Sequence, residues 1–212
     1  MPPMRRHHRG HHPGRYGNPS DLARMIARQE APTRAAWQKP AAVIRTLGLR
    51  PGQTVADVGA GPGYFSVRLA RVVRTSGHVY AIDPEPAILQ VLRDRLTTAR
   101  VANVTPVLGR GNDPLLPARS CDVALMVNMF HHVEDRPGFL RRLALVLRRG
   151  GRLVNIDFAC RETPVGPPLE HRVAREHFLR VARRAGLALV AEHHFLPYQY
   201  FLVLRSSIAK KG

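Results

Sequence analysis

Strand-like and helix-like hydrophobic patterns alternate along the middle of the chain. Between the apolar runs, Phe65, Leu69 and Val73 repeat at the spacing of an amphipathic helix, and later segments repeat in the same way. Strands that alternate with helices predict a mostly parallel sheet with helices on both faces. The runs of strand length are Thr54–Val58, Val79–Ile82, Val104–Leu108, Asp122–Val127 and Leu153–Ile156.

The pattern changes at both ends of this region. Asn18-Pro19-Ser20-Asp21 is a favourable helix start, and we expect a helix through Glu30, a helical turn around Trp37 and a helix from Ala41 to Leu47. We expect a helix after Asp135 to stop at Gly150-Gly151. Another is expected near Leu169–Ala185.

Two closely spaced runs, Leu187–Glu192 and Tyr200–Leu204, suit an antiparallel pair at the end of the chain. The expected fold is therefore α/β and doubly wound, with a mostly parallel seven-stranded Rossmann-like sheet and an antiparallel C-terminal strand pair.

The strong positive charge of the chain raises the question of whether it binds nucleic acid. The formal net charge is +18, and arginine supplies nearly all of the positive charge. The arginines occur in nearly every segment, often on the outer faces of predicted helices, which is typical of a solvated surface. Nucleic-acid contact is possible but is not the favoured interpretation.

The chain length suits one domain, and no apolar run approaches the length of a membrane span. The positive start Met1–His8 lacks the apolar region of a signal peptide, so we expect a soluble, cytoplasmic protein without a membrane partner. Cys121 and Cys160 form no metal-binding or redox motif; Cys121 is expected in the core.

A glycine-rich loop follows the first predicted strand. It contains Gly59, Gly61 and Gly63, directly after the strand that carries Asp57 and directly before a helix. Free N–H groups in such a loop point at a bound polar group, which predicts a nucleotide-type pocket. Tyr64 stands where a dinucleotide-binding motif has its third glycine, and a P-loop motif is absent from the sequence.

The segment hydrophobic-Asp-Val-Gly-Ala-Gly-Pro-Gly resembles the first motif of class I S-adenosylmethionine-dependent methyltransferases. The resemblance continues from Pro51 to the C-terminal strand pair and is closest to the small-molecule type of ubiquinone and menaquinone biosynthesis. It implies S-adenosylmethionine as cofactor and S-adenosylhomocysteine as product.

The resemblance also implies which residues bind the cofactor. Asp57 would lie near its ammonium group, and Asp83, followed by Pro84, would accept hydrogen bonds from both ribose hydroxyls. Considered by itself, Asp83 would also be compatible with a binding site for a nicotinamide dinucleotide. The loop residues implied to approach the methionine part are Gly59, Ala60, Gly61, Gly63 and Tyr64.

Three further residues complete the implied cofactor site. Asn112 and Asp113 fall where the family contacts adenine, and Asn128 falls beside the sulfonium centre. Local roles remain open for several positions: Asp57 could cap a helix, Asp83 could begin a turn, and Asn128 could be an ordinary loop residue.

Candidate catalytic residues lie at the predicted carboxyl ends of strands, where ligands bind in such sheets. His131 and His132 follow the fourth strand, and Asp157 ends the fifth. A histidine there could act as a base, orient the acceptor or make a structural hydrogen bond. We expect no metal site.

The expected organisation is a disordered tail over 1–17, lid helices over 18–48, a methyltransferase domain over 49–205 and a tail over 206–212. The expected function is methyl transfer from S-adenosylmethionine to an unidentified small-molecule acceptor. The alternatives are an RNA methyltransferase that uses the arginine-rich surface, and a cofactor-binding module without catalysis. The sequence leaves the oligomeric state open.

Overall fold

A computed structural model describes residues 19–206, apart from the side chains of residues 19–22 and 25. The predicted tail over 1–17, with its histidines, and residues 207–212 of the predicted C-terminal tail lie outside this range. The side chain of Met25 in the predicted lid also lies outside the described part.

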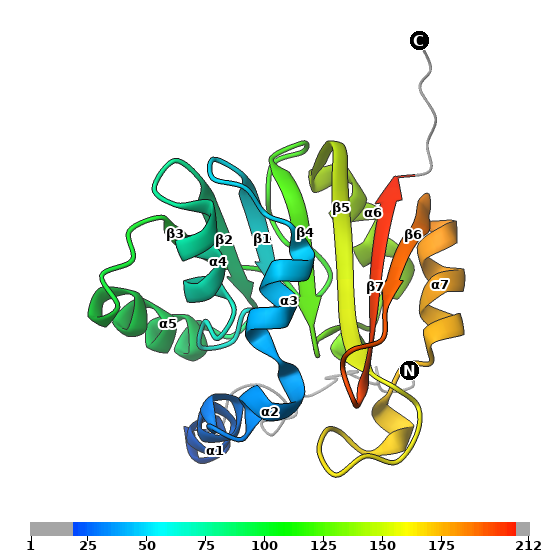
Figure 1. The fold of residues 1–212 in the computed structure, drawn as a ribbon, viewed down its shortest axis with the longest axis horizontal. Coiled ribbons are helices and arrows are strands. Elements are labelled where there is room, and N and C mark those ends of the chain that lie inside the picture. The colour runs from blue at the N-terminus through cyan, green and yellow to red at the C-terminus, as the bar shows by residue number, and fades with distance from the viewer. Residues whose placement is uncertain (1–18, 207–212) are drawn as a thin grey trace, which may run out of the picture.

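A seven-stranded sheet has the order β3-β2-β1-β4-β5-β7-β6 (Figure 1). Every neighbouring pair is parallel except those that involve β7. The predicted fold class is therefore confirmed, including the antiparallel C-terminal pair. The strands are β1 Thr54–Val58, β2 His78–Asp83, β3 Val104–Leu108, β4 Cys121–Val127, β5 Leu147–Phe158, β6 Leu187–His193 and β7 Gln199–Ser206.

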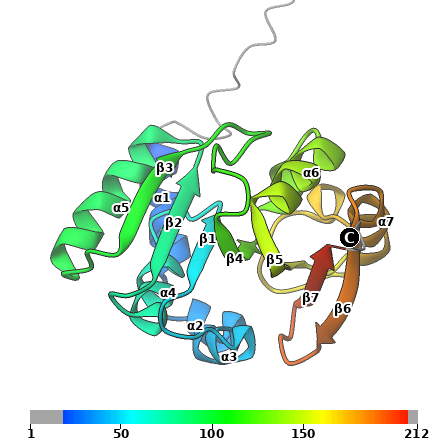
Figure 2. The ribbon, with the colours of Figure 1, turned by 90° about the horizontal axis from the view of Figure 1, so that it is seen from above.

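Helices cover both faces of the sheet (Figure 2). The elements α3, α4 and α5 pack on one face, and α6 and α7 on the other. At the edge where the parallel strands end, α1 and α2 lie outside these layers (Figure 1). The helices are α1 Pro19–Glu30, α2 Arg34–Gln38, α3 Pro40–Leu47, α4 Ser66–Val73, α5 Pro86–Thr98, α6 Arg136–Val146 and α7 Arg175–Arg184, with short 3-10 turns η1 Phe130–His132 and η2 Leu169–His171.

The periodic apolar residues form one core on each side of the sheet. Leu69 and Leu92 are buried on the side of α4 and α5, and Phe130 packs edge-on against Phe178 on the other side. Burial of one such side chain contributes about 1.5–3 kcal/mol before conformational entropy is subtracted. These contacts fix the helices to the sheet and so hold the loops at its edge.

The strand order reverses between β1 and β4. The helix after β1 packs on one face, whereas the helix after β4 packs on the other. The two loops therefore diverge at the carboxyl ends of the strands, which is the place where ligands bind in doubly wound sheets.

The prediction that Gly150-Gly151 ends the helix after Asp135 was wrong. Asp135 does cap the start of α6, accepting a hydrogen bond from Gly138 N at 2.9 Å, but α6 ends at Val146. The glycine pair lies inside β5, where the pairing with β4 shifts register. Gly150 has φ +79°, so the pair permits a bulge at the beginning of the strand.

The helix predicted near Leu169–Ala185 is shorter in the structure. Only the turn η2 and then α7, from Arg175 onward, are helical. Between them, the Arg172 side chain donates hydrogen bonds to the carbonyl groups of Pro167, Ala159 and Arg161. These contacts hold the segment extended against the sheet edge.

Across residues 19–206, none of the helices has the length and apolar character required to cross a membrane.

Candidate functional site

The glycine-rich loop is fixed to the neighbouring strand. Gly59 N and Ala60 N donate hydrogen bonds of 2.8 and 2.9 Å to the same acceptor, the carbonyl oxygen of Ile82. Gly59, Gly61 and Gly63 all have positive φ, at +72°, +56° and +86°. L-residues with a side chain rarely adopt these angles, so the loop requires glycine at each position.

Different neighbours occupy the space beside each glycine. A Cβ atom on Gly59 would lie 2.6 Å from Met129 Cβ, and one on Gly61 would lie 2.6 Å from the Gln29 carboxamide oxygen. A Cβ atom on Gly63 would lie 2.4 Å from Leu92 Cδ1 of α5. Met129 therefore packs against Gly59 and α1 packs against Gly61, whereas Gly63 allows close packing between the loop and α5.

Asp57, at the end of β1, is almost completely buried behind the loop. Its Oδ2 accepts a 2.6 Å hydrogen bond from Ser66 Oγ at the start of α4. Burial raises the pKa of Asp57 to about 6, although Ser66 and the positive charge of Arg34 oppose the shift. A cation in this position would stabilise the ionised carboxylate.

Arg34 of α2 supplies a buried positive charge near Asp57. Its guanidinium lies 4.0 Å from the centre of the Tyr64 ring, and its Nη1 donates to Gln29 O at 2.8 Å. Burial lowers the pKa of Arg34 to about 10. Among the described residues, Arg34 Nε and Tyr64 Oη have no hydrogen-bond partner.

Tyr64 lies between two arginines. The guanidinium of Arg68 is 4.2 Å from the centre of the Tyr64 ring, in addition to the contact with Arg34. Cations over an aromatic face are attracted by its quadrupole. The ring therefore positions Arg34 at the loop, which gives Tyr64 a clear structural role.

Asp83 ends β2 on the other side of the glycine loop. Its Oδ2 accepts a hydrogen bond from Gly61 N and its Oδ1 accepts one from Glu85 N, both at 3.0 Å. Burial raises the pKa of Asp83 to about 6, which outweighs these two hydrogen bonds. Pro84 follows on the exposed surface.

Asn112 and Asp113 lie in the loop after β3, close in sequence to the carboxyl end of that strand. Asp113 Oδ1 accepts from Leu115 N at 2.9 Å, and Asp113 Oδ2 lies 3.3 Å from Arg142 Nε on α6. Arg142 also donates to the carbonyl of Asn112. Arg142 therefore holds this loop, and the Asn112 side chain is exposed.

Asn128, directly after β4, belongs to a closed ring of three amide side chains. Asn128 donates to Gln38 at 3.1 Å, Gln38 donates to Gln199 at 3.0 Å, and Gln199 donates to Asn128. Each amide thus donates once and accepts once. The ring joins α2, the end of β4 and the beginning of β7, and Gln38 is completely buried. Asn128 has φ +55°, a conformation that asparagine tolerates.

His131 and Asp157 form a buried pair. His131 Nδ1 lies 2.9 Å from Asp157 Oδ1, and the two side chains are only 6% and 1% exposed. Asp157 Oδ2 also accepts from the His131 backbone N at 3.3 Å. If Nδ1 carries the proton, the carboxylate fixes the tautomer that leaves Nε2 as an acceptor. This arrangement can orient a histidine for proton transfer.

His132 is exposed, and its ring lies 4.1 Å from that of His131, centre to centre.

Three aromatic side chains pack together near the end of β5. The ring of Trp37 lies 5.6 Å from that of Phe158 and 6.5 Å from that of Tyr198, measured between ring centres. These three aromatic residues come from α2, β5 and the segment before β7. They form an apolar wall next to the amide ring.

The structure therefore brings Asp57, Asp83 and the glycine loop together at the carboxyl ends of β1 and β2. It places Asn128 and the pair His131–Asp157 at the adjoining ends of β4 and β5. No group of three or more His, Cys, Asp or Glu residues among those described could hold a metal ion.

Sequence reasoning missed Arg34, Gln38, Ser66 and Gln199. Arg34 is one arginine among many, and the two glutamines lie far apart in the chain, so no local signal marked them. Ser66 could have been found, because it follows the glycine loop at the start of a helix that packs beside Asp57.

Comparisons with known proteins find similarity to methyltransferases. The family model for the methyltransferase domain matches residues 56–155. The chain is 41% identical over 125 residues to a demethylmenaquinone methyltransferase from Tropheryma whipplei (strain Twist), covering 59% of this chain and 49% of that protein. It is 34% identical over 127 residues to a ubiquinone/menaquinone biosynthesis C-methyltransferase from Vibrio vulnificus (strain YJ016), covering 59% and 48%. The chain thus spans about half the length of the curated relatives it matches.

Solved structures extend the similarity over most of the chain. A SAM-dependent methyltransferase from Aquifex aeolicus has a TM-score of 0.81 at 26% identity, covering 88% of this chain and 97% of that one. The [4+2]-cyclase SpnF shares the fold, with a TM-score of 0.69 at 16% identity and 83% coverage of each chain. The chain therefore contains a segment, residues 56–155, that matches the methyltransferase domain family, and its sequence and fold resemble those of S-adenosylmethionine-dependent methyltransferases, including relatives of the ubiquinone and menaquinone biosynthesis type.

Proposed function

We propose that this protein transfers a methyl group from S-adenosylmethionine to a small aromatic acceptor of the quinone type. The observation that carries the proposal is the pair of buried, opposite charges beside the glycine loop, Asp57 and Arg34. The pair matches the ammonium and carboxylate groups of the methionine part of the cofactor. Opposite charges placed for a zwitterion give both affinity and orientation.

The residues present fit S-adenosylmethionine on three further counts. Arg34 Nε and Tyr64 Oη are buried donors without a partner among the described residues. Asp83 presents two carboxylate oxygens for the ribose hydroxyls, and the pKa of Asp57 and of Asp83 is raised to about 6 because each is buried without a full counter-charge. Asn112 or Asp113 would border the adenine, beside the exposed side chain of Leu108.

The acceptor would lie between the amide ring and the aromatic wall. Trp37 and Tyr198 offer flat apolar surfaces for a ring, and His131 lies at the neighbouring strand end. The relatives named for demethylmenaquinone and for ubiquinone/menaquinone biosynthesis support an acceptor of this chemistry. We assign residues 18–48 as a lid, because α2 carries Arg34, Trp37 and Gln38 into the site.

Bound S-adenosylmethionine supplies a methyl group on a sulfonium centre. The chain would position the reactants: Asp57 and Asp83 would hold the cofactor, Asn128 would lie near the reacting carbon, and α2 would exclude water from the site. His131 Nε2 accepts the proton that leaves the acceptor, and Asp157 stabilises the imidazolium that forms. His132 and the loop residue Ala60 contribute contacts at the rim.

Calorimetric titration with S-adenosylhomocysteine tests the cofactor site. Asp83→Asn keeps the shape of the side chain but removes its charge, so we expect roughly ten- to hundredfold weaker binding. Asp94→Asn on the exposed face of α5 is the matched control and should bind normally. Unchanged affinity in Asp83→Asn would remove the ribose role.

Turnover with a demethylmenaquinone of short side chain and labelled S-adenosylmethionine tests the acceptor. His131→Gln should lower kcat about a hundredfold or more, with normal S-adenosylhomocysteine affinity, if His131 is the base. The fold alone does not determine methyl transfer, since the [4+2]-cyclase SpnF has the same fold. Cofactor binding without any methylated product would therefore favour the non-catalytic alternative.

A further inference from the structure

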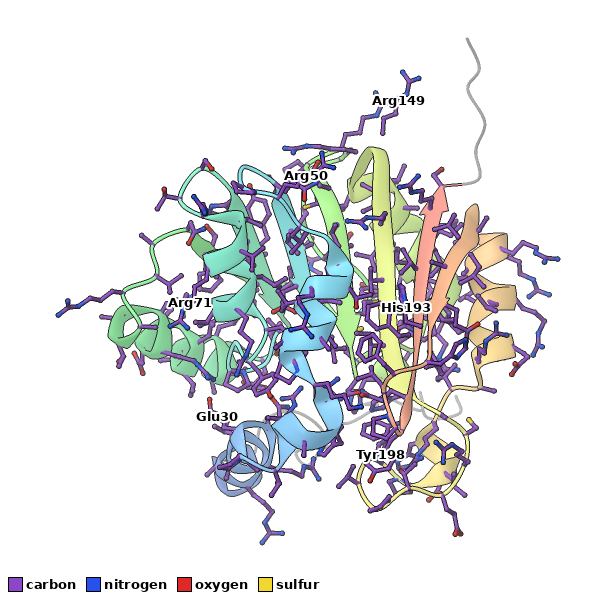
Figure 3. All side chains as sticks on the ribbon, viewed as in Figure 1. Glu30, Arg50, Arg71, Arg149, His193 and Tyr198 are labelled. Atoms are coloured by element: carbon purple, nitrogen blue, oxygen red, sulfur yellow. The ribbon has the colours of Figure 1, made fainter. Side chains whose placement is uncertain are left out.

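Half of the exposed arginines among the described residues, nine of eighteen, lie at one edge of the folded molecule. An arginine lies near the amino end of each strand from β1 to β6, either before the strand, at its first residues or at the end of the preceding helix, and Arg205 lies near the end of the antiparallel β7 at the same edge. In Figure 3, Arg50 and Arg149 project from this edge, whereas Glu30 and Tyr198 lie at the opposite one. We define the arginine edge by its exposed members Arg50, Arg74, Arg100, Arg119, Arg148, Arg149, Arg183, Arg184 and Arg205.

Very little negative charge balances this edge. Within five residues of these arginines along the described chain, Asp122 is the one acidic residue, and it accepts a 2.9 Å hydrogen bond from Arg148. The other eight arginines of the edge form no ion pair with a described carboxylate. Most acidic residues of the sheet lie at the other edge, where Asp57, Asp83 and Asp157 end their strands.

Two arginines of neighbouring strands lie directly opposite each other here. Arg152 of β5 pairs in register with Arg205 of β7, and their like charges repel. A bound anion would relieve this repulsion. A bound polyanion would therefore neutralise the positive charge of the edge and would also relieve the repulsion between Arg152 and Arg205.

We propose that the arginine edge binds the phosphate backbone of duplex nucleic acid. Neighbouring strands lie about 4.8 Å apart, so the sheet extends about 29 Å across its seven strands. This width is slightly less than the length of one turn of B-form duplex. Guanidinium groups bind phosphates in bidentate fashion.

The composition of the edge favours a duplex over other polyanions. Its connecting segments contain no Phe, Tyr or Trp, so they lack the stacking platforms that single-stranded nucleic acids use. They also lack the aromatic anchors typical of binding to a membrane surface. A backbone-only interaction with a duplex requires neither.

The position of the edge separates this interaction from methyl transfer. The cofactor site and the arginine edge lie at opposite ends of the strands, so a duplex bound there does not reach His131. The inference therefore differs from an RNA methyltransferase, in which the nucleic acid is the acceptor. Duplex binding would locate the enzyme and leave its site open.

The test is fluorescence anisotropy of the full chain with a labelled DNA duplex of about 20 base pairs, over about 50–200 mM salt. The edge variant R50Q/R119Q/R149Q is compared with R93Q/R141Q/R180Q, which removes three exposed arginines from the outer faces of α5, α6 and α7. We expect the edge variant to bind at least tenfold more weakly, and its salt slope to fall by about 0.9 for each lost phosphate contact. The helix-face variant should remain close to the wild type.

Three results would overturn the inference. These are no duplex binding by the wild type at about 150 mM salt, equal losses in both triple variants, or edge-dependent binding only to phosphatidylglycerol vesicles. Competition between the duplex and S-adenosylhomocysteine would also contradict it. Titration of the edge variant with S-adenosylhomocysteine keeps the two proposals distinguishable, since the cofactor site should be intact there.

Discussion

At the scale of single residues, the site depends on carboxyl groups whose surroundings oppose their ionisation. Burial raises the pKa of both Asp57 and Asp83 to about 6, well above the ordinary value of 3.8. The folded, ligand-free protein then holds more protons than the unfolded chain between about pH 4 and 6, so its stability falls as the pH rises through this window.

Cofactor affinity should have the opposite dependence on pH. The ammonium group beside Asp57 and the ribose hydroxyls beside Asp83 stabilise the ionised carboxylates. Lowering the pH from 7.5 to 5 should therefore weaken S-adenosylhomocysteine binding about tenfold for each carboxylate. Calorimetry in buffers of different ionisation enthalpy should show proton release near pH 6. Affinity that does not change across this range would contradict the assigned roles.

The glycines give a second prediction at this scale. Gly63→Ala meets both a positive φ and a contact of 2.4 Å with Leu92, whereas Gly48→Ala meets only the positive φ, with open space around it. Gly48→Ala should cost about 1 kcal/mol of unfolding free energy, and Gly63→Ala clearly more. Urea unfolding of the two variants separates strain from steric overlap. Equal losses would show that Leu92 moves aside without cost.

At the scale of elements, the amide ring attaches α2 to the sheet. Gln38→Ala removes one member and leaves Gln199 and Asn128 each with an unsatisfied group. We expect faster hydrogen exchange in α1 and α2 and a raised KM for the cofactor, with a smaller effect on kcat.

Gln90→Ala, on the exposed face of α5, is the matched control and should change neither quantity. Gln38→Glu keeps the shape but replaces the amide donor with a carboxylate, so it should not rescue the lid. If α2 exchanged at the wild-type rate in Gln38→Ala, another contact would have to hold it.

Most elements could be predicted because their signals are local. The strand at Thr54–Val58 and the helices around Leu69 and Leu92 follow directly from apolar periodicity. The glycine pair at Gly150 was misread because glycine indicates a special backbone angle without saying whether it ends a helix or makes a bulge. The segment before Arg175 has helical composition, but tertiary hydrogen bonds of Arg172 hold it extended.

At the scale of the whole molecule, ligand binding should stabilise the fold. S-adenosylhomocysteine at about 100 times its Kd should add about 2.7 kcal/mol, which raises Tm by roughly 5–10 °C for a domain of this size. Differential scanning fluorimetry measures this shift. Asp57→Asn should reduce this rise in Tm at neutral pH. A Tm that does not change when the ligand is added would contradict cofactor binding.

The sequence by itself determined the fold class, the glycine loop and the acids Asp57 and Asp83, because each of these depends on patterns within a few neighbouring residues. Only the tertiary structure brought Arg34 to the loop, closed the amide ring of Gln38, Asn128 and Gln199, and placed nine exposed arginines at one edge. The physical reason is separation along the chain. Contacts between distant segments depend on how helices and strands pack. The pattern of residues along the chain indicates the secondary structure of each segment, but it does not indicate which other segment will lie against it.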